Sequence, residues 1–143
     1  MIFNKGIFIK NWFYFFFFYI NLNMSFKHVL KEVFGFQDLR PFQKKVVNSM
    51  LKDENIVVIS PTGSGKSLCF QLPAMLYEGI TIVLSPLKSL IYDQVEALKK
   101  KGISCELLNG DLGIRKKTSL FEELKKATPS LKMLYTTPEM LLC

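Results

Sequence analysis

The residues most suited to chemistry lie in a glycine-bearing loop at residues 60–67, which ends in the pair Lys66 and Ser67. Gly63 and Gly65 can adopt backbone angles closed to other residues, so the main chain can approach a phosphate closely. Backbone N–H groups in such a loop, and the N-terminus of a following helix, attract anions. The lysine offers a point charge to phosphate oxygens and the serine a hydroxyl to Mg²⁺. The loop therefore predicts a nucleoside triphosphate site.

This loop matches the P-loop pattern G-x-x-x-x-G-K-S/T except at its first position, where Ser60 replaces glycine. An apolar β-branched run precedes it at residues 56–59, and apolar residues at helical spacing follow from Leu68. That strand–loop–helix context distinguishes a P-loop from a glycine turn with a solvated lysine. The predicted nucleotide contacts in the loop are Thr62, Gly63, Ser64, Gly65, Lys66 and Ser67.

The hydrophobic pattern also predicts the elements that must position this loop. Strands are expected at residues 56–59, 81–84, 105–108 and 132–135, and helices at 26–34 and 41–51 and from Lys66, Ser89 and Arg115. This alternation indicates an α/β fold with a parallel sheet. The polar loops SPLKSL and TTPE follow two of the strands. Both loops should lie at the sheet edge where such folds bind ligands.

Several segments, in this order and spacing, resemble motifs of the RecQ DNA helicases. They are FGFQDLRPFQ, SPTGSGKSLCFQLPA, SPLKSLIYDQV and YTTPEML; ELLNGD with LKMLYTTPE is most similar to the Bloom-type branch. The likeness covers about residue 26 to the C-terminus, although Ser64 replaces a glycine usual in the family and Thr136 a usual valine. It implies a P-loop NTPase of the RecA-like kind, with a parallel sheet flanked by helices. The implied activity is ATP-dependent 3′–5′ DNA unwinding with Mg²⁺.

The resemblance also implies roles for individual residues. It assigns Arg40 and Gln43 to the adenine, with Gln43 pairing bidentately with the base edge. Lys66 and Ser67 take the catalytic phosphate and Mg²⁺ roles. The implied contacts to a single DNA strand are Ser85, Lys88, Ser89, Thr137 and Pro138. Contacts of this kind, chiefly to phosphates, position a strand without recognising its sequence.

Each assignment has a simpler structural alternative. Arg40 and Gln43 begin an amphipathic helix and could face solvent, and Ser-Pro or Thr-Pro after a strand is ordinary turn chemistry. The net charge of +7 suits a polyanion, yet runs such as residues 99–101 commonly face water on helices. Two other functions stay open at this point. One is an RNA helicase of the same superfamily, and the other is a non-catalytic nucleotide-binding fragment or pseudogene product.

In the resembled family, a later Asp-Glu-x-His strand holds Mg²⁺ and activates water, and a second lobe supplies arginine fingers. The chain stops at Cys143, before either. Phosphoryl transfer depends on positioned charge around the transferred group. We therefore expect a partial domain, incomplete at its C-terminus and inactive alone. Without the missing strand, the strand at residues 56–59 should expose an apolar, unpaired edge.

The N-terminal residues 1–23 are rich in phenylalanine but contain an unbroken apolar run only at residues 12–20. A membrane-spanning helix needs about 20 apolar residues, so no stable membrane insertion is expected. No small-x-small cleavage site follows, as a secretory signal would require. We expect residues 1–23 to be an extension outside the fold, with a targeting segment as the alternative, and residues 24–143 to be a partial ATP-binding domain.

The three cysteines are widely spaced, with no C-x-x-C pair, which argues against a disulfide framework and against zinc. Reduced thiols inside a cell are the expected state, and Cys69 falls in the apolar helix after the loop, where it should be a small core residue. The resemblance implies a nuclear location, or a cytoplasmic one if the source is prokaryotic, and a role in DNA repair and recombination. Protein partners do not follow from the sequence.

Overall fold

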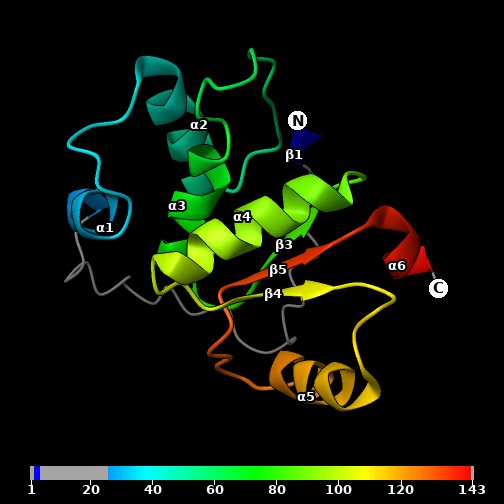
Figure 1. Ribbon diagram of the computed structural model, residues 1–143. Helices are drawn as coiled ribbons and strands as arrows, with labels where there is room; N and C mark the ends of the chain where they lie inside the picture. The colour runs from blue at the N-terminus through cyan, green and yellow to red at the C-terminus, as the bar shows by residue number, and fades with distance from the viewer. Residues whose placement is uncertain (1, 4–25, 143) are drawn as a thin grey trace. The chain divides into compact units, whose positions relative to one another are not determined.

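The computed structural model describes residues 2–3 and 26–142 of the 143-residue chain. These residues divide into two compact units, Met1–Leu76 and Tyr77–Cys143. Each unit is an assembly of helices with short strands (Figure 1). The predicted nucleotide contacts all fall in the first unit and the predicted DNA contacts in the second.

The first unit is built on three helices, α1 (Phe26–Glu32), α2 (Pro41–Leu51) and α3 (Leu68–Leu76), of which α1 and α2 both pack against α3. Proline at the first position of α2 fits a helix start, since that residue's N–H would have no partner in the helix. The core lies where the three helices meet, and its fully buried side chains include Leu30, Val47, Cys69 and Leu72. The prediction that Cys69 is a core residue is confirmed.

Strand β2 (Ile56–Val57) is shorter than the expected strand at residues 56–59. It pairs antiparallel with β1 (Ile2–Phe3), so Ile2 lies opposite Val57 and Phe3 opposite Ile56. The ladder ends there, and Ile59 is 94% exposed, as expected for an apolar strand residue without a neighbouring strand. Strand β1 covers one edge of β2, and within the two-stranded sheet of the described residues no strand pairs with its other edge, as expected. Ile2 and Phe3, which belong to the extension expected at residues 1–23, are thus paired with β2. For residues 4–23 the expectation lies outside the described residues.

The second unit contains a parallel three-stranded sheet in the order β3–β5–β4. The strands are β3 (Thr81–Leu84), β4 (Cys105–Leu108) and β5 (Met133–Thr136). Every residue of β5 is buried, as expected for the central strand of a parallel sheet covered on both faces. The predicted α/β fold with a parallel sheet is confirmed.

Two helices cover opposite faces of this sheet, α4 (Lys88–Lys100) on one and α5 (Ile114–Leu124) on the other (Figure 1). On the α4 side, the Cys105 thiol donates to the Val95 carbonyl oxygen at 3.5 Å. On the α5 side, a cluster of buried leucines joins the helix to β4 and β5, consisting of Leu108, Leu120, Leu131 and Leu134. Successive side chains of a strand point to opposite faces of the sheet, so Cys105 of β4 faces α4 whereas Leu108 faces α5.

Element boundaries otherwise differ from the predictions by one or two residues, which is the usual scatter at helix and strand ends. The expected bounds of α2, β3 and β4 agree with the structure, whereas α1 ends at Glu32 and β5 begins at Met133. The helix expected from Lys66 begins only at Leu68, because Lys66 and Ser67 still belong to the loop turn. A short helix, α6 (Pro138–Leu142), was not expected.

Candidate functional site

The glycine-bearing loop at residues 60–67 folds back sharply between β2 and α3. Gly63 and Gly65 have φ values of 77° and 87°, in the left-handed region that favours glycine. Between them, the Ser64 N–H donates to the Pro61 carbonyl oxygen at 3.3 Å and closes a turn. The two glycines are therefore required by the shape of the loop.

Three consecutive backbone N–H groups, those of Gly65, Lys66 and Ser67, make no hydrogen bond within the part of the chain that the structure describes. The next N–H, of Leu68, already donates to the Gly65 carbonyl oxygen at 3.3 Å as α3 begins. Unpaired amides at a helix start form a concave donor set for anions, and the helix dipole adds positive potential. This arrangement fits a phosphate chain.

The Lys66 side chain folds over this loop. Its ammonium group donates to the carbonyl oxygens of Ser60, at 2.7 Å, and Pro61. The Ser64 hydroxyl is buried and has no hydrogen-bond partner among the described residues. Buried hydroxyls without a partner are costly in proteins, so this oxygen is a candidate ligand contact. A cation and an unsatisfied hydroxyl beside free amides fit a polyphosphate, provided that Lys66 exchanges its carbonyl partners for phosphate oxygens.

Gln43 braces the same loop from α2. Its side chain is only 4% exposed; Oε1 accepts from the Arg40 N–H and Nε2 donates to the Gly65 carbonyl oxygen, both at 2.9 Å. The Arg40 guanidinium donates to the Ser64 carbonyl oxygen at 3.0 Å. The alternative that Gln43 faces solvent is wrong. Its bidentate contact with adenine stays a prediction, which requires the amide to exchange both of these partners.

The second candidate site lies at the carboxyl ends of β3 and β5, in the second unit. The Ser85 N–H donates to the Thr136 carbonyl oxygen at 3.1 Å, which continues the β3–β5 ladder beyond the strands. The Ser85 hydroxyl accepts from the Leu87 N–H at 3.3 Å and turns the chain into α4. Lys88 and Ser89 follow at the start of α4, and both are exposed. The structure thus brings Ser85, Lys88 and Ser89 close to the end of β5.

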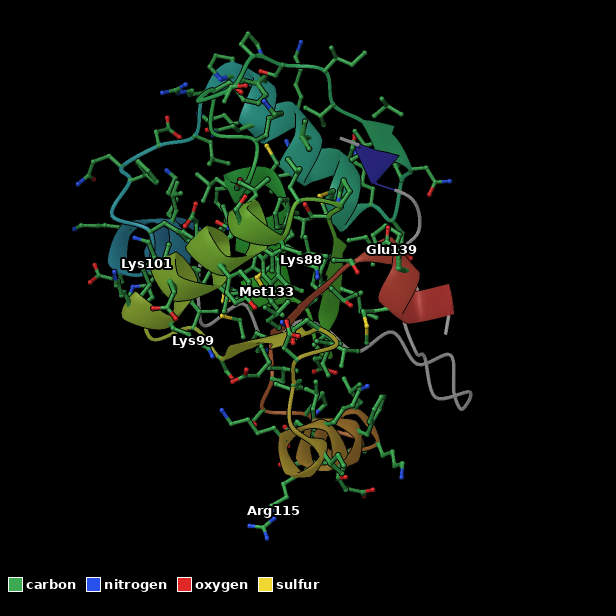
Figure 2. All side chains as sticks on the ribbon, turned by 45° about the vertical axis from the view of Figure 1, so that its right-hand side comes forward. Lys88, Lys99, Lys101, Arg115, Met133 and Glu139 are labelled. Atoms are coloured by element: carbon green, nitrogen blue, oxygen red, sulfur yellow. The ribbon has the colours of Figure 1, made fainter. Side chains whose placement is uncertain are left out.

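Thr137 and Pro138 adjoin this edge, but Thr137 is only 5% exposed. A neighbour that the sequence analysis missed is Glu139, in the first turn of α6. Its own backbone N–H, the Thr137 hydroxyl and the nearby charge of Lys88 together lower the pKa of the Glu139 carboxyl (Figure 2). A carboxylate therefore lies beside the predicted phosphate contacts, and a DNA strand would have to approach from the Lys88 side.

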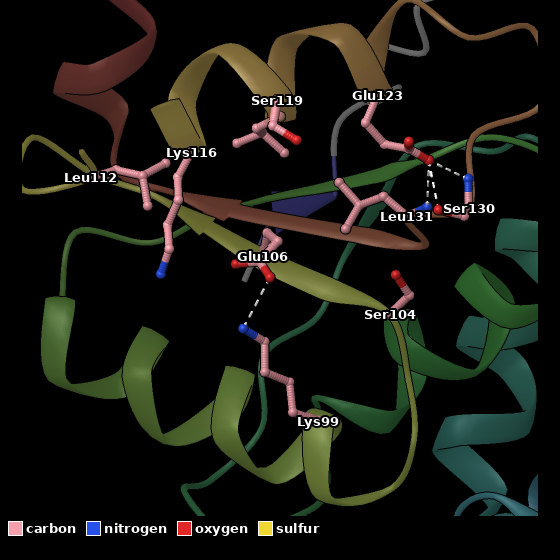
Figure 3. A pocket seen from close by; sticks show the side chains of 10 residues that line it. Lys99, Ser104, Glu106, Leu112, Lys116, Ser119, Glu123, Ser130 and Leu131 are labelled. Carbon is pink, nitrogen blue, oxygen red and sulfur yellow. Dashed lines mark hydrogen bonds and ion pairs between the residues drawn. The ribbon is translucent and has the colours of Figure 1, made fainter. Parts of the chain in front are cut away.

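A hollow of about 360 Å³ lies elsewhere on the second unit, beside β4 and α5 (Figure 3). Its charged lining residues include Lys99 and Glu106, which form an ion pair at 3.1 Å, and Lys116 and Glu123. None of its lining residues was predicted to bind nucleotide or DNA. The hollow therefore shares no residue with the sites described above.

A dedicated metal site is not apparent in the described ranges, where no three His, Cys, Asp or Glu side chains group together. Mg²⁺ held at Ser67 would have to be coordinated mainly by phosphate oxygens and water, which is its common mode with nucleotides. Within residues 26–142, no helix has the length and apolarity needed to cross a bilayer. Burial raises the pKa of the Cys69 and Cys105 thiols, which keeps both neutral and unreactive at neutral pH.

Comparison with known proteins finds a match between residues 40–143 and the family model for DEAD/DEAH box helicases. The chain is 45% identical over 119 residues to the RecQ-like DNA helicase blm-1 of Caenorhabditis elegans, covering 83% of this chain and 12% of that protein. It is 44% identical over 116 residues to the ATP-dependent DNA helicase Q5 of Rattus norvegicus, which covers 80% of this chain and 12% of that protein. It is 41% identical over 111 residues to the ATP-dependent DNA helicase RecQ of Haemophilus influenzae, which covers 78% of this chain and 18% of that protein.

The chain therefore spans between about one eighth and one fifth of the length of these curated relatives. Its parallel sheet with helices on both faces corresponds to part of a RecA-like fold. The matched region includes Arg40, Gln43, the loop at residues 60–67 and both strand-end loops of the second unit.

Proposed function

The chain belongs to the DEAD/DEAH box helicase family, and on this premise we propose that it forms the ATP-binding and DNA-contacting portion of a RecQ-type DNA helicase. The relatives at 41–45% identity, named as RecQ-type or ATP-dependent DNA helicases, support this choice within the family. In this proposal residues 24–143 are a partial first ATP-binding domain, and residues 1–23 are an extension to it. The expected setting is 3′–5′ unwinding during DNA repair and recombination in the nucleus.

The observation that carries the proposal is the set of unpaired N–H groups of Gly65, Lys66 and Ser67 at the start of α3. These amides would hold the phosphates of ATP, with the Lys66 ammonium on the β and γ oxygens and the Ser67 hydroxyl on Mg²⁺. Arg40 and Gln43 would contact the adenine. Of the remaining loop residues, Thr62, Gly63 and Ser64 would shape the cradle, and the buried Ser64 hydroxyl would gain a partner.

The DNA-contacting part consists of Ser85, Lys88 and Ser89, with Thr137 and Pro138 beside them. The Ser85 and Ser89 hydroxyls and the Lys88 ammonium at a sheet edge can hold phosphates, which positions a strand but conveys no sequence preference. The low pKa of Glu139 means that its carboxylate is charged at neutral pH and repels phosphate. Lys88 would consequently be the main attractive contact.

Hydrolysis requires more than these residues supply. Residues 1–143 contain no Asp-Glu-x-His sequence. Binding of ATP uses ground-state contacts to phosphate, whereas turnover needs groups that stabilise charge as it develops in the transition state. We therefore assign nucleotide binding, but not turnover on its own, to this polypeptide.

Replacement of Lys66 by alanine tests the nucleotide site. A hydrogen bond between charged groups contributes about 1.5–3 kcal/mol, so Lys66→Ala should weaken binding of a fluorescent ATP analogue by about 10- to 100-fold. Equilibrium titration with Mg²⁺ present measures this, and thermal melting checks that the variant is folded. Lys45→Ala, which removes an exposed lysine of α2, should bind like the parent. Equal affinity in parent and Lys66→Ala would rule out the proposed phosphate site.

A further inference from the structure

An aromatic side chain at the DNA-contacting edge has no role in the function proposed above. Tyr92, on α4, is 46% exposed, and its hydroxyl oxygen accepts a hydrogen bond from the Asn109 side-chain amide at 2.8 Å. Asn109 follows β4 directly and is only 6% exposed. A buried amide thus anchors the polar end of the ring. The ring is held in one orientation, with about half of its surface open to solvent.

The position of Tyr92 on α4 relates it to the predicted phosphate contacts. Lys88 and Tyr92 are four residues apart in one helix, so their side chains lie on the same face, with Cβ atoms about 5–6 Å apart. Asn109 lies at the carboxyl end of β4, and Ser85 at the carboxyl end of β3. Because the strands are parallel, these ends share one edge of the sheet. The exposed ring therefore lies about one helical turn from the proposed phosphate-binding lysine.

From this arrangement we propose that Tyr92 is a stacking platform for one base of the single DNA strand whose phosphate is held by Lys88. The inference rests on the proposed DNA-binding function and adds a residue and a mode of contact to it. A cation for the backbone beside an aromatic ring for the base is the usual combination in single-strand binding. The hydroxyl keeps its Asn109 bond while the ring face is covered, so stacking leaves no polar group unsatisfied.

Stacking and phosphate contacts differ in their dependence on salt. Each phosphate neutralised by a cation releases counterions and steepens the fall of affinity with salt, by about 0.7 in the log–log slope for a single strand. Stacking on a neutral ring contributes affinity without changing that slope. The two contacts can therefore be separated by measuring affinity across a series of salt concentrations.

The test measures binding of a fluorescein-labelled oligothymidine to the 143-residue chain by fluorescence anisotropy at several salt concentrations. Tyr92→Leu keeps apolar bulk and helix propensity but removes the ring, and should weaken binding by about 5- to 100-fold at every salt concentration with an unchanged slope. Tyr92→Phe keeps the ring and should stay within about threefold of the parent. Lys88→Ala should reduce the slope by about 0.7.

Photocrosslinking with an oligonucleotide that carries 5-iodouracil then maps the contact, and mass spectrometry should find the modified base on Tyr92. If Lys88→Ala weakens binding but Tyr92→Leu binds like the parent, the stacking role is overturned while the DNA-binding function stands. If the parent chain binds no oligothymidine even at low salt, the proposed DNA-binding function fails, and the stacking role fails with it.

Discussion

At the scale of single residues, Gly65 is a point of direct contact between the P-loop and Gln43 of α2. A Cβ atom placed on Gly65 would lie 2.6 Å from Nε2 of Gln43, the atom that donates to the Gly65 carbonyl oxygen. Because Gln43 is also tied to the Arg40 N–H, it cannot retreat without losing a second bond. The absence of a side chain at Gly65 thus permits both the loop conformation and its brace.

Gly65→Ala should accordingly be more damaging than Gly63→Ala. Both glycines have positive φ values, so each alanine variant should lose about 1–2 kcal/mol of folding free energy from backbone strain. A Cβ on Gly63 meets no atom within 4 Å, whereas a Cβ on Gly65 displaces Gln43. Chemical denaturation and titration with an ATP analogue should both show the larger loss in Gly65→Ala. Indistinguishable variants would show that the Gln43 brace has no energetic effect.

At the scale of elements, Glu123 fastens α5 to the start of β5. Its carboxylate accepts hydrogen bonds from the Ser130 hydroxyl, the Ser130 N–H and the Leu131 N–H (Figure 3). It also forms an ion pair with Lys126. These donors, with the Lys126 bond the largest contribution, lower the pKa of Glu123 to about 2. One ionised group therefore adds to the leucine cluster in connecting α5 with the central strand β5.

The pH dependence of stability should reveal this carboxylate. Its folded-state pKa lies below its ordinary value of 4.5, so its stabilising effect is complete above about pH 4.5 and is lost as pH falls toward 2. Glu123→Gln should lower the melting temperature at pH 7, and the difference from the parent should shrink between pH 4.5 and 2. Thermal melts across this range measure it. Glu122→Gln, whose carboxylate pairs with Lys125 on the helix surface, is the control and should change little. A Glu123→Gln difference that is constant with pH would contradict the assignment.

Thr136 illustrates a second link between elements. Its side chain is fully buried and its hydroxyl donates to the Leu108 carbonyl oxygen at 2.8 Å, which joins the ends of β5 and β4. The same carboxyl ends carry Asn109 and Thr137, the residues that hold Tyr92 and Glu139. The edge proposed to contact DNA is therefore ordered by polar bonds between strand ends as well as by the leucine cluster beneath.

At the scale of the whole molecule, binding and turnover of ATP should be separable. The 143-residue chain should bind an ATP analogue in a Lys66-dependent way, yet release phosphate from Mg-ATP no faster than Lys66→Ala does. The reason is that turnover relies on carboxylate and arginine groups around the transferred phosphoryl, and an arginine finger alone contributes about 10³- to 10⁵-fold in kcat. Phosphate release with and without single-stranded DNA measures this. If the chain hydrolyses ATP faster in the presence of DNA, and Lys66→Ala abolishes this hydrolysis, the assignment of binding without turnover is contradicted.

Much of the local structure could be predicted because it depends on local physics. The bounds of α2 followed from Pro41 and helical spacing, and β3 and β4 from short apolar runs between turn residues. Strand β2 was predicted too long, since a strand exists only where a neighbour supplies hydrogen bonds, and its neighbour is β1. Helix α6 was missed because a five-residue helix carries too little periodicity to detect.

The sequence by itself determined the types of groups available: two glycines and the Lys66–Ser67 pair in one loop, and hydroxyls with a lysine after a strand. Tertiary structure alone decided that Gln43 braces Gly65, that Lys88 lies near Glu139, and that Asn109 anchors Tyr92. These pairs are separated by 22, 51 and 17 positions in the chain. Side-chain periodicity reports only which face a residue occupies within its own element. Which faces meet is decided when burial of apolar surface packs the elements together.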